Sequence, residues 1–179
     1  LAGMHGLEVI DALPQNVHGG SMRYILARKG ARTVSDRVRE IMANEEKQGL
    51  KQFSTYQAFA ANVAQNKEDL LALLKRLKSE GKRIVGYGAT SKSTTVLNYC
   101  GIGPEYIEFI SDTTPIKQGK YTPGMHIPVK PYEAFVSDYP EYALLFAWNH
   151  GEEIIANENA FKDAGGKFIL YVDQVRVGE

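Results

Sequence analysis

The stretch Lys82-Arg-Ile-Val-Gly-Tyr-Gly-Ala-Thr-Ser-Lys-Ser93 decides the fold of this chain. Its apolar pair, Ile84 and Val85, is followed by two glycines, and helical spacing of apolar residues continues beyond Thr94. This order predicts a strand, a tight turn and a helix. Glycines let the backbone approach an anion closely, and the first turn of a helix offers unpaired N–H donors at the positive end of its dipole.

The turn at residues 86–92 is therefore a candidate diphosphate site, with five candidate contacts: Gly86, Gly88, Ala89, Ser91 and Lys92. Lys92 falls in the first turn of the helix, where a cation is unfavourable unless an anion lies nearby. Two glycines of the dinucleotide-binding pattern Gly-x-Gly-x-x-Gly are present, but Ser91 occupies the third position. A simple tight turn after a parallel strand explains the two glycines equally well.

Composition narrows the function classes. The chain has 179 residues, enough for one domain or a domain with an appended piece. The net charge is zero and the basic residues are scattered, which argues against binding of nucleic acid or an anionic membrane. Cys100 is the only cysteine, so a disulfide scaffold or a Cys-rich zinc site within the chain is excluded. With no apolar stretch of transmembrane length and no signal pattern, we expect a soluble, cytoplasmic protein without a metal site.

The first part of the chain predicts a β-hairpin and helices. Strands are expected at residues 7–13 and 21–28, a short helix at 35–49, and a long helix at about 55–79. The first six residues resemble the end of a helix with a glycine cap, and there is no initiator methionine. We therefore expect a fragment of a longer protein.

After Gly81 the pattern alternates between strands and helices. Strands are predicted at residues 84–87, 106–111, 142–147 and 168–172, and helices at 91–99, 132–136 and 152–164. This alternation predicts an α/β fold with a mostly parallel sheet wrapped by helices. The connection at residues 113–130 is long and rich in proline and glycine, which indicates an ordered, functional loop.

In an open α/β sheet, ligands bind at the carboxyl ends of the strands, where the strand order reverses. Three candidate stretches follow three predicted strands, so one pocket can gather them. Asp112 lies at the spacing of a ribose-binding acid from Gly88, and lysines in the long loop could contact phosphate. Alternatively, Asp112 ends a strand, the lysines are solvated, and His150 lies near a helix N-terminus. The candidates in these stretches are Asp112, Lys117, Lys120, Tyr121, Asn149 and His150.

His18 stands beside Gly19 and Gly20, which leave room for a substrate. A group that titrates near neutral pH can act there as a base or a hydrogen-bond partner. Arg23 could contact an anion if the strand places it on the same side. Spacing alone favours a simpler interpretation, a turn histidine and a surface arginine.

Four separated stretches together resemble the carboxyl-terminal half of the sugar C-methyltransferases. They are Val17-His-Gly-Gly-Ser-Met-Arg23, Gly86-Tyr-Gly-Ala-Thr-Ser-Lys92, Lys117-Gln-Gly-Lys-Tyr-Thr-Pro-Gly124, and Ala147-Trp-Asn-His150 continuing through Glu153-Ile154. The resemblance implies a Rossmann-like domain, with helices on both faces of its sheet, that binds a nucleotide-linked keto-deoxysugar, commonly a thymidine diphosphate (dTDP) sugar. It also implies that S-adenosylmethionine is bound by a domain absent from this chain, and it gives His18 a supporting role in catalysis.

The chain departs from that family pattern in what it lacks. The cysteine-rich zinc-binding segment, the central S-adenosylmethionine domain and the upstream Glu-His and Tyr acid–base residues are absent. We therefore expect this chain to be inactive by itself. The resemblance makes residues 1–52 the remnant of an upstream catalytic domain, and residues 53–179 a sugar-nucleotide-binding domain with a leading long helix.

Two other functions stay open at this stage. A nicotinamide-dependent oxidoreductase domain is supported by the two glycines and Asp112, but it is opposed by Ser91 and by the lack of a Tyr-x-x-x-Lys set. A non-catalytic nucleotide-binding module could use the same pocket. The sequence leaves the sugar, the methylated carbon and the oligomeric state open.

Overall fold

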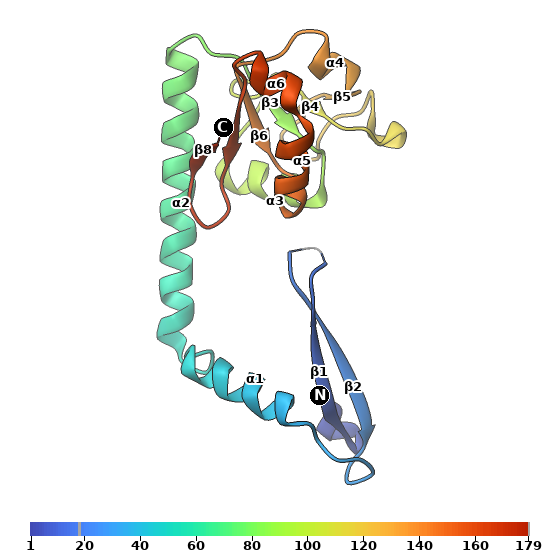
Figure 1. Ribbon diagram of the computed structural model, residues 1–179. Helices are drawn as coiled ribbons and strands as arrows, with labels where there is room; N and C mark the ends of the chain where they lie inside the picture. Colours follow the sequence, from blue (N-terminus) through green and yellow to red (C-terminus); the bar gives the residue numbers. More distant parts are fainter. Residues whose placement is uncertain (18, 179) are drawn as a thin grey trace. The chain divides into compact units, whose positions relative to one another are not determined.

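The computed structural model describes residues 1–17 and 19–178, whose contacts form two compact units (Figure 1). The first unit is Leu1–Ala61 and the second is Asn62–Glu179. The boundary between them lies within the long helix α2, Phe53–Ser79. The predicted division into 1–52 and 53–179 stays a prediction.

The first unit is built on an antiparallel hairpin. After the short 3₁₀ helix η1 (Ala2–His5), strand β1 (Leu7–Gln15) pairs with β2 (Ser21–Arg28), with a bulge between Val9 and Asp11. Helix α1 (Asp36–Lys47) follows. Both strands of the hairpin are therefore confirmed, and β1 extends two residues beyond the prediction.

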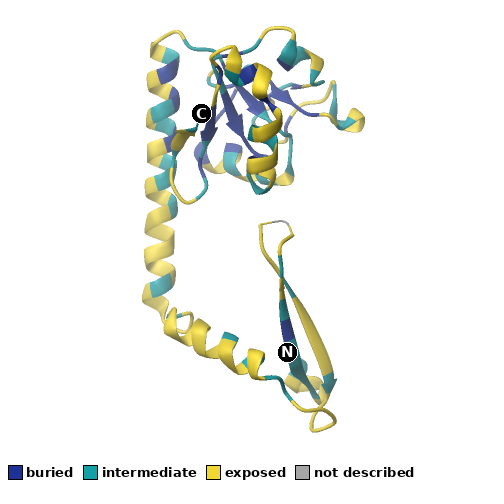
Figure 2. Cartoon of the chain, viewed as in Figure 1, coloured by how far each residue is buried: buried dark blue, intermediate teal, exposed yellow. Residues whose placement is uncertain are grey.

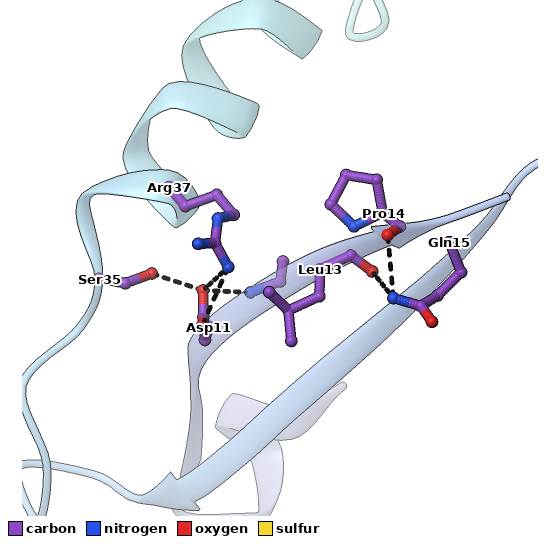
Figure 3. A network of polar contacts seen from close by, with 7 residues as sticks. Asp11, Leu13, Pro14, Gln15, Ser35 and Arg37 are labelled. Atoms are coloured by element: carbon purple, nitrogen blue, oxygen red, sulfur yellow. Dashed lines mark hydrogen bonds and ion pairs between the residues drawn. The ribbon is translucent and has the colours of Figure 1, made fainter.

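Asp11 holds the start of α1 against β1 (Figure 3). Its Oδ1 accepts a hydrogen bond from Ser35 Oγ at 2.8 Å, and both carboxylate oxygens lie 3.3 Å from Arg37 Nη1. The hydrogen bond from Ser35 is the largest cause that holds the pKa of Asp11 below its ordinary value. Polar contacts thus position this helix, since Ala12 is the one buried apolar residue among the described residues of the unit.

The second unit contains a six-stranded sheet in the order β5-β4-β3-β6-β7-β8. The first five strands are parallel and β8 is antiparallel to β7. The strands are β3 (Ile84–Tyr87), β4 (Ile110–Ser111), β5 (Val129–Lys130), β6 (Tyr142–Leu145), β7 (Lys167–Leu170) and β8 (Arg176–Gly178). A parallel order that runs outward on one side and then returns to the centre is that of the Rossmann fold.

Two hydrophobic clusters cover the two faces of this sheet because side chains alternate along each strand. Ile84 belongs to one cluster and Val85 to the other. The first cluster joins the sheet to the second half of α2 and to α3 (Ser91–Cys100). The second cluster joins it to α4 (Glu133–Val136), α5 (Gly151–Asn157) and α6 (Asn159–Asp163). Helices on both faces of a mostly parallel sheet confirm the predicted fold class.

Figure 2 shows the buried residues concentrated in the strands of this sheet. Along α2, Leu70, Leu74 and Leu77 are buried in the first cluster, at helical spacing. By contrast, Phe53 and Phe59, in the part of α2 that belongs to the first unit, are 75% and 67% exposed. The second half of α2 thus packs against the sheet, whereas the apolar side chains of its first part are exposed in the described chain.

Two predicted elements are corrected, and two short strands are added. The strand predicted at 106–111 is limited to Ile110–Ser111, because the N–H groups of Tyr106 and Ile107 donate to Gly103 in a turn. The helix predicted at 152–164 is broken at Glu158 into α5 and α6. The short strands β5 and β8 were not predicted, since two or three residues are too few for a periodic pattern.

Candidate functional site

The strand order reverses between β3 and β6. From β3 the chain continues to β4 and β5 on one side, and it then returns to β6 on the other side of β3. The turn after β3 and the short 3₁₀ helix η3 (Trp148–His150) after β6 therefore meet at this point. Ligands of α/β sheets bind at such a position, outside the carboxyl ends of the strands.

The two glycines of the turn have different roles. Gly86 is buried within β3, and a Cβ atom there would lie 2.8 Å from side-chain atoms of both Ile110 and Phe146. Glycine is therefore required at position 86 because the packing around β3 leaves no room for a side chain. Gly88 forms the turn, with φ of 87°, a backbone conformation that favours glycine. A Cβ atom at Gly88 would also lie 2.9 Å from that of Ala147.

Asp112 holds this turn in place from the end of β4. Its Oδ2 accepts hydrogen bonds from Ala89 N–H at 2.7 Å and Lys117 Nζ at 3.1 Å, and its Oδ1 accepts one from Thr114 N–H at 2.8 Å. Burial alone would raise the pKa of this carboxyl group, but the bonds from Thr114 and Lys117 outweigh it and hold the pKa below its ordinary value. The predicted ribose-binding acid thus already accepts three protein donors.

Helix α3 begins immediately after the turn, with Thr90 as its N-cap. Thr90 Oγ1 accepts a hydrogen bond from Ser93 N–H at 3.1 Å. The N–H groups of Ser91 and Lys92 come earlier in the first turn and have no acceptor within the helix. They remain available to solvent or to an anion.

The Lys92 side chain leaves the helix and spans the switch point. Its Nζ donates to Asn149 Oδ1 at 2.8 Å and lies 5.0 Å from the centroid of the Trp148 ring. The amide and the ring are both uncharged, and in the described part of the chain no carboxylate forms an ion pair with Lys92. Within the described chain, the ammonium charge is therefore stabilised by the amide dipole and by the aromatic face.

A cavity of about 290 Å³ lies on one side of the turn, and we name it the lysine cavity. It brings the turn together with the long loop, because Ala89 and Thr90 line it with Lys117, Lys120 and Tyr121. The loop is fixed by backbone hydrogen bonds, among them Gly119 N–H to Val129 O and Val129 N–H to Lys120 O. The prediction of an ordered loop is confirmed.

A second cavity of about 490 Å³ also borders the turn, and we name it the acidic cavity. Three carboxylates line it, those of Asp112, Glu153 and Glu158, together with the exposed His150. Tyr87 Oη donates to one oxygen of the buried Glu158 at 2.5 Å, and Tyr132 Oη donates to the other at 3.0 Å. We name Tyr87, Tyr132 and Glu158 the Glu158 cluster.

The sequence analysis missed this cluster. Glu158 was expected inside a continuous helix, and neither tyrosine stood out in the sequence. Thr90 was also missed, although a threonine directly before a helix is a recognisable N-cap signal.

Two predicted site residues, His18 and Arg23, are not placed relative to these cavities. His18 falls outside the described residues. Arg23 is an exposed residue of β2, in the first unit, where it pairs with Leu13 across the hairpin. Among residues 1–17 and 19–178, no group of three or more histidine, cysteine or acidic residues is arranged to hold a metal ion. The same residues include no helix that is both long and apolar enough to cross a membrane.

Comparison of the sequence with known proteins shows its family. Residues 16–173 match the family model of the C-methyltransferase C-terminal domain. The chain belongs to this family. It is also 40% identical over 174 residues to the C-methyltransferase NovU of Streptomyces niveus, an alignment that covers 97% of this chain. The same alignment covers 41% of NovU, so the chain spans about two fifths of the length of that C-methyltransferase.

Proposed function

We propose that this C-methyltransferase C-terminal domain binds the sugar-nucleotide substrate of an S-adenosylmethionine-dependent enzyme that methylates a carbon of a nucleotide-linked keto-deoxysugar. The observation that carries the proposal is the position of Lys92 at the switch point of the sheet, where its contacts are an amide and an aromatic ring. A half-buried cation without a carboxylate partner is suited to an anionic ligand. The diphosphate of a sugar nucleotide is such a ligand.

The surroundings of Lys92 support a diphosphate site. The free N–H groups at the start of α3 offer two donors at the positive end of the helix dipole. Lys117 and Lys120 line the adjoining lysine cavity, and Tyr121, 66% exposed, gives that cavity an aromatic surface. We propose that the diphosphate contacts the turn and Lys92, and that the long loop covers the nucleoside.

The first unit supports the proposal that residues 1–52 complete a catalytic domain in a longer protein. Its hairpin exposes Tyr24, Ile25 and Leu26 by 59%, 39% and 48%. A two-stranded hairpin alone is marginally stable, and three or more strands or a packed helix are usually required. A neighbouring part of the same polypeptide could supply these missing contacts.

The second unit does not fit S-adenosylmethionine as its own ligand. The acid at the ribose-binding position, Asp112, already accepts donors from Ala89, Thr114 and Lys117. We therefore propose that a domain outside this chain binds the methyl donor, which supplies an electrophilic methyl group, and that this chain binds and orients the acceptor sugar. His18 is proposed to assist proton transfer or to orient the ketone.

The contacts of Asp112 also weigh against an NAD-dependent oxidoreductase, because such domains bind the ribose hydroxyl groups of NAD with a carboxylate at this position. A thermal-shift screen separates the candidates. Ligands that bind only the folded state raise the melting temperature by mass action. At a concentration 100 times the Kd, the free energy of unfolding increases by about 2.7 kcal/mol. We expect stabilisation by dTDP and dTDP-glucose, and none by NAD⁺, NADP⁺ or S-adenosylmethionine. Stabilisation by the dinucleotides alone would overturn the proposal.

We also propose a cytoplasmic location for the protein.

A further inference from the structure

The Glu158 cluster fixes one wall of the acidic cavity from three separate elements. Glu158, at the break between α5 and α6, is only 6% exposed, with backbone angles of φ −88° and ψ 47°. Tyr87 comes from the end of β3 and Tyr132 from the start of α4. The two phenols lie 71 and 26 residues from Glu158 in sequence, so tertiary contacts determine this arrangement.

The direction of these hydrogen bonds sets the chemistry of the wall. Burial is the largest cause that raises the pKa of both phenols, and the bond to Glu158 adds to it. The pKa of Tyr132 rises to about 12, so this hydroxyl keeps its proton at neutral pH and donates it to the carboxylate. A phenol has one donor and two acceptor lone pairs. With each proton directed at Glu158, the phenol oxygens face other groups as acceptors.

The two other carboxylates of the acidic cavity are acceptors as well, while His150 and Asn157 in its lining can also donate. Asp112 is an acceptor, and Glu153 adds a further carboxylate. None of the described residues that line this cavity is lysine or arginine. The lysine cavity, which Thr90 also lines, has two lysines and, among the described residues, no acidic residue in its lining. An ionised diphosphate has no proton to donate and is repelled by carboxylates, so it is disfavoured in the acidic cavity.

We infer that the acidic cavity receives the sugar ring of the ligand, and that Glu158 is a positioning residue that turns Tyr87 and Tyr132 into acceptors for the hydroxyl or amino groups of that ring. This inference rests on the proposed function and adds a division of the ligand between two cavities. The diphosphate and nucleoside occupy the turn and the lysine cavity, and the hydrogen-bond donors of the sugar occupy the acidic cavity. The Glu158 cluster then determines specificity for the sugar without contacting the nucleotide.

The test compares dTDP with dTDP-glucose, which differ only by the sugar. Isothermal titration calorimetry on the 179-residue chain gives the ratio of the two affinities. Glu158→Gln forces one phenol to accept from the new amide and to turn its own proton elsewhere, and Tyr132→Phe removes one phenol. Tyr139→Phe is the matched control, because Tyr139 packs on Phe135 with its ring 5.3 Å away but does not donate to Glu158.

We expect the wild-type chain to bind dTDP-glucose more tightly than dTDP. In Glu158→Gln and Tyr132→Phe, the ratio of the affinity for dTDP-glucose to that for dTDP should fall by about 3- to 10-fold, as expected for the loss of one hydrogen bond. The affinity for dTDP itself should stay within about 2-fold of the wild-type value. The control should keep both affinities. If Glu158→Gln does not fold, Tyr132→Phe decides.

An unchanged ratio in the two cluster variants would overturn the inference. An equal loss for both ligands would also overturn it, since the cluster would then support the nucleoside or the fold alone. Equal affinity of the wild-type chain for both compounds would overturn this inference but leave the proposed function intact. Binding of neither compound would overturn both.

Discussion

Replacement of Asp112 by asparagine should destabilise the second unit, because three donors converge on its carboxylate. The asparagine oxygen can keep one backbone donor, but its NH₂ group then faces the others. One buried N–H without a partner costs about 1–3 kcal/mol. The half-exposed ion pair with Lys117 adds at most about 1 kcal/mol after solvent screening. We therefore expect a loss of about 1–4 kcal/mol in the free energy of unfolding, measured by urea denaturation at pH 7.

The pH dependence of this loss has a definite sign. The folded-state pKa of Asp112 is lowered, so its stabilisation is fully present above its unfolded pKa of about 3.9 and is lost as the pH falls through the folded value. The gap between wild type and Asp112→Asn should be constant from about pH 7 to 5 and should narrow below about pH 4. Asp163→Asn, the same change at an exposed position, is the control. A loss at Asp112 no larger than the control's would refute the proposed role of Asp112 in holding the turn.

Three further predictions concern the turn, the loop and His18. Gly86→Ala should cost about 1–3 kcal/mol of stability by overpacking against Ile110 and Phe146, and an unchanged urea midpoint would contradict the packing role. Tyr121→Ala should weaken dTDP binding by about 1 kcal/mol in calorimetry without changing the melting temperature, because we propose that this exposed ring packs on the ligand, and equal dTDP affinity would contradict that contact. His18→Asn in a full-length enzyme should lower turnover by about 10²–10⁴ fold with little change in melting temperature, whereas full activity with an altered melting temperature would indicate a structural histidine.

The fold was predictable because its signals are local. The Ile84-Val85 pair, the glycine turn and the following helix appear in one continuous stretch, and the alternation of strands and helices specifies a parallel sheet. The short edge strands β5 and β8 were not predictable, since they exist through pairing with β4 and β7. The break between α5 and α6 at Glu158 was not predictable either, because apolar residues continue at helical spacing on both sides of Glu158. The two tyrosines that donate to the Glu158 carboxylate are distant in sequence.

The sequence predicted which residues belong to the candidate site better than it predicted the contacts that these residues make. The rule that ligands bind at the carboxyl ends of strands anticipated the contact of Lys92 with Asn149 and that of Asp112 with the turn. It predicted one pocket, whereas two cavities border the turn and neither has Lys92 or Asn149 among its described lining residues. Spacing could not reveal that Asp112 accepts the N–H of Ala89, because hydrogen-bond direction depends on the folded turn. Likewise, two glycines in one motif look equivalent in sequence, yet Gly86 packs within the sheet and Gly88 turns the backbone.

The most direct test of the proposed function is the affinity for dTDP of the wild-type chain and of Lys92→Ala, measured by calorimetry. The wild-type chain should bind dTDP, and Lys92→Ala should lose about 1–3 kcal/mol of binding free energy, the range for a hydrogen bond to a charged group. Lys75→Ala, an exposed lysine on α2 that lines neither cavity, should bind as the wild type does. Equal affinity of Lys92→Ala and wild type, or no binding of dTDP to either, would contradict the assignment of the switch point as the diphosphate site.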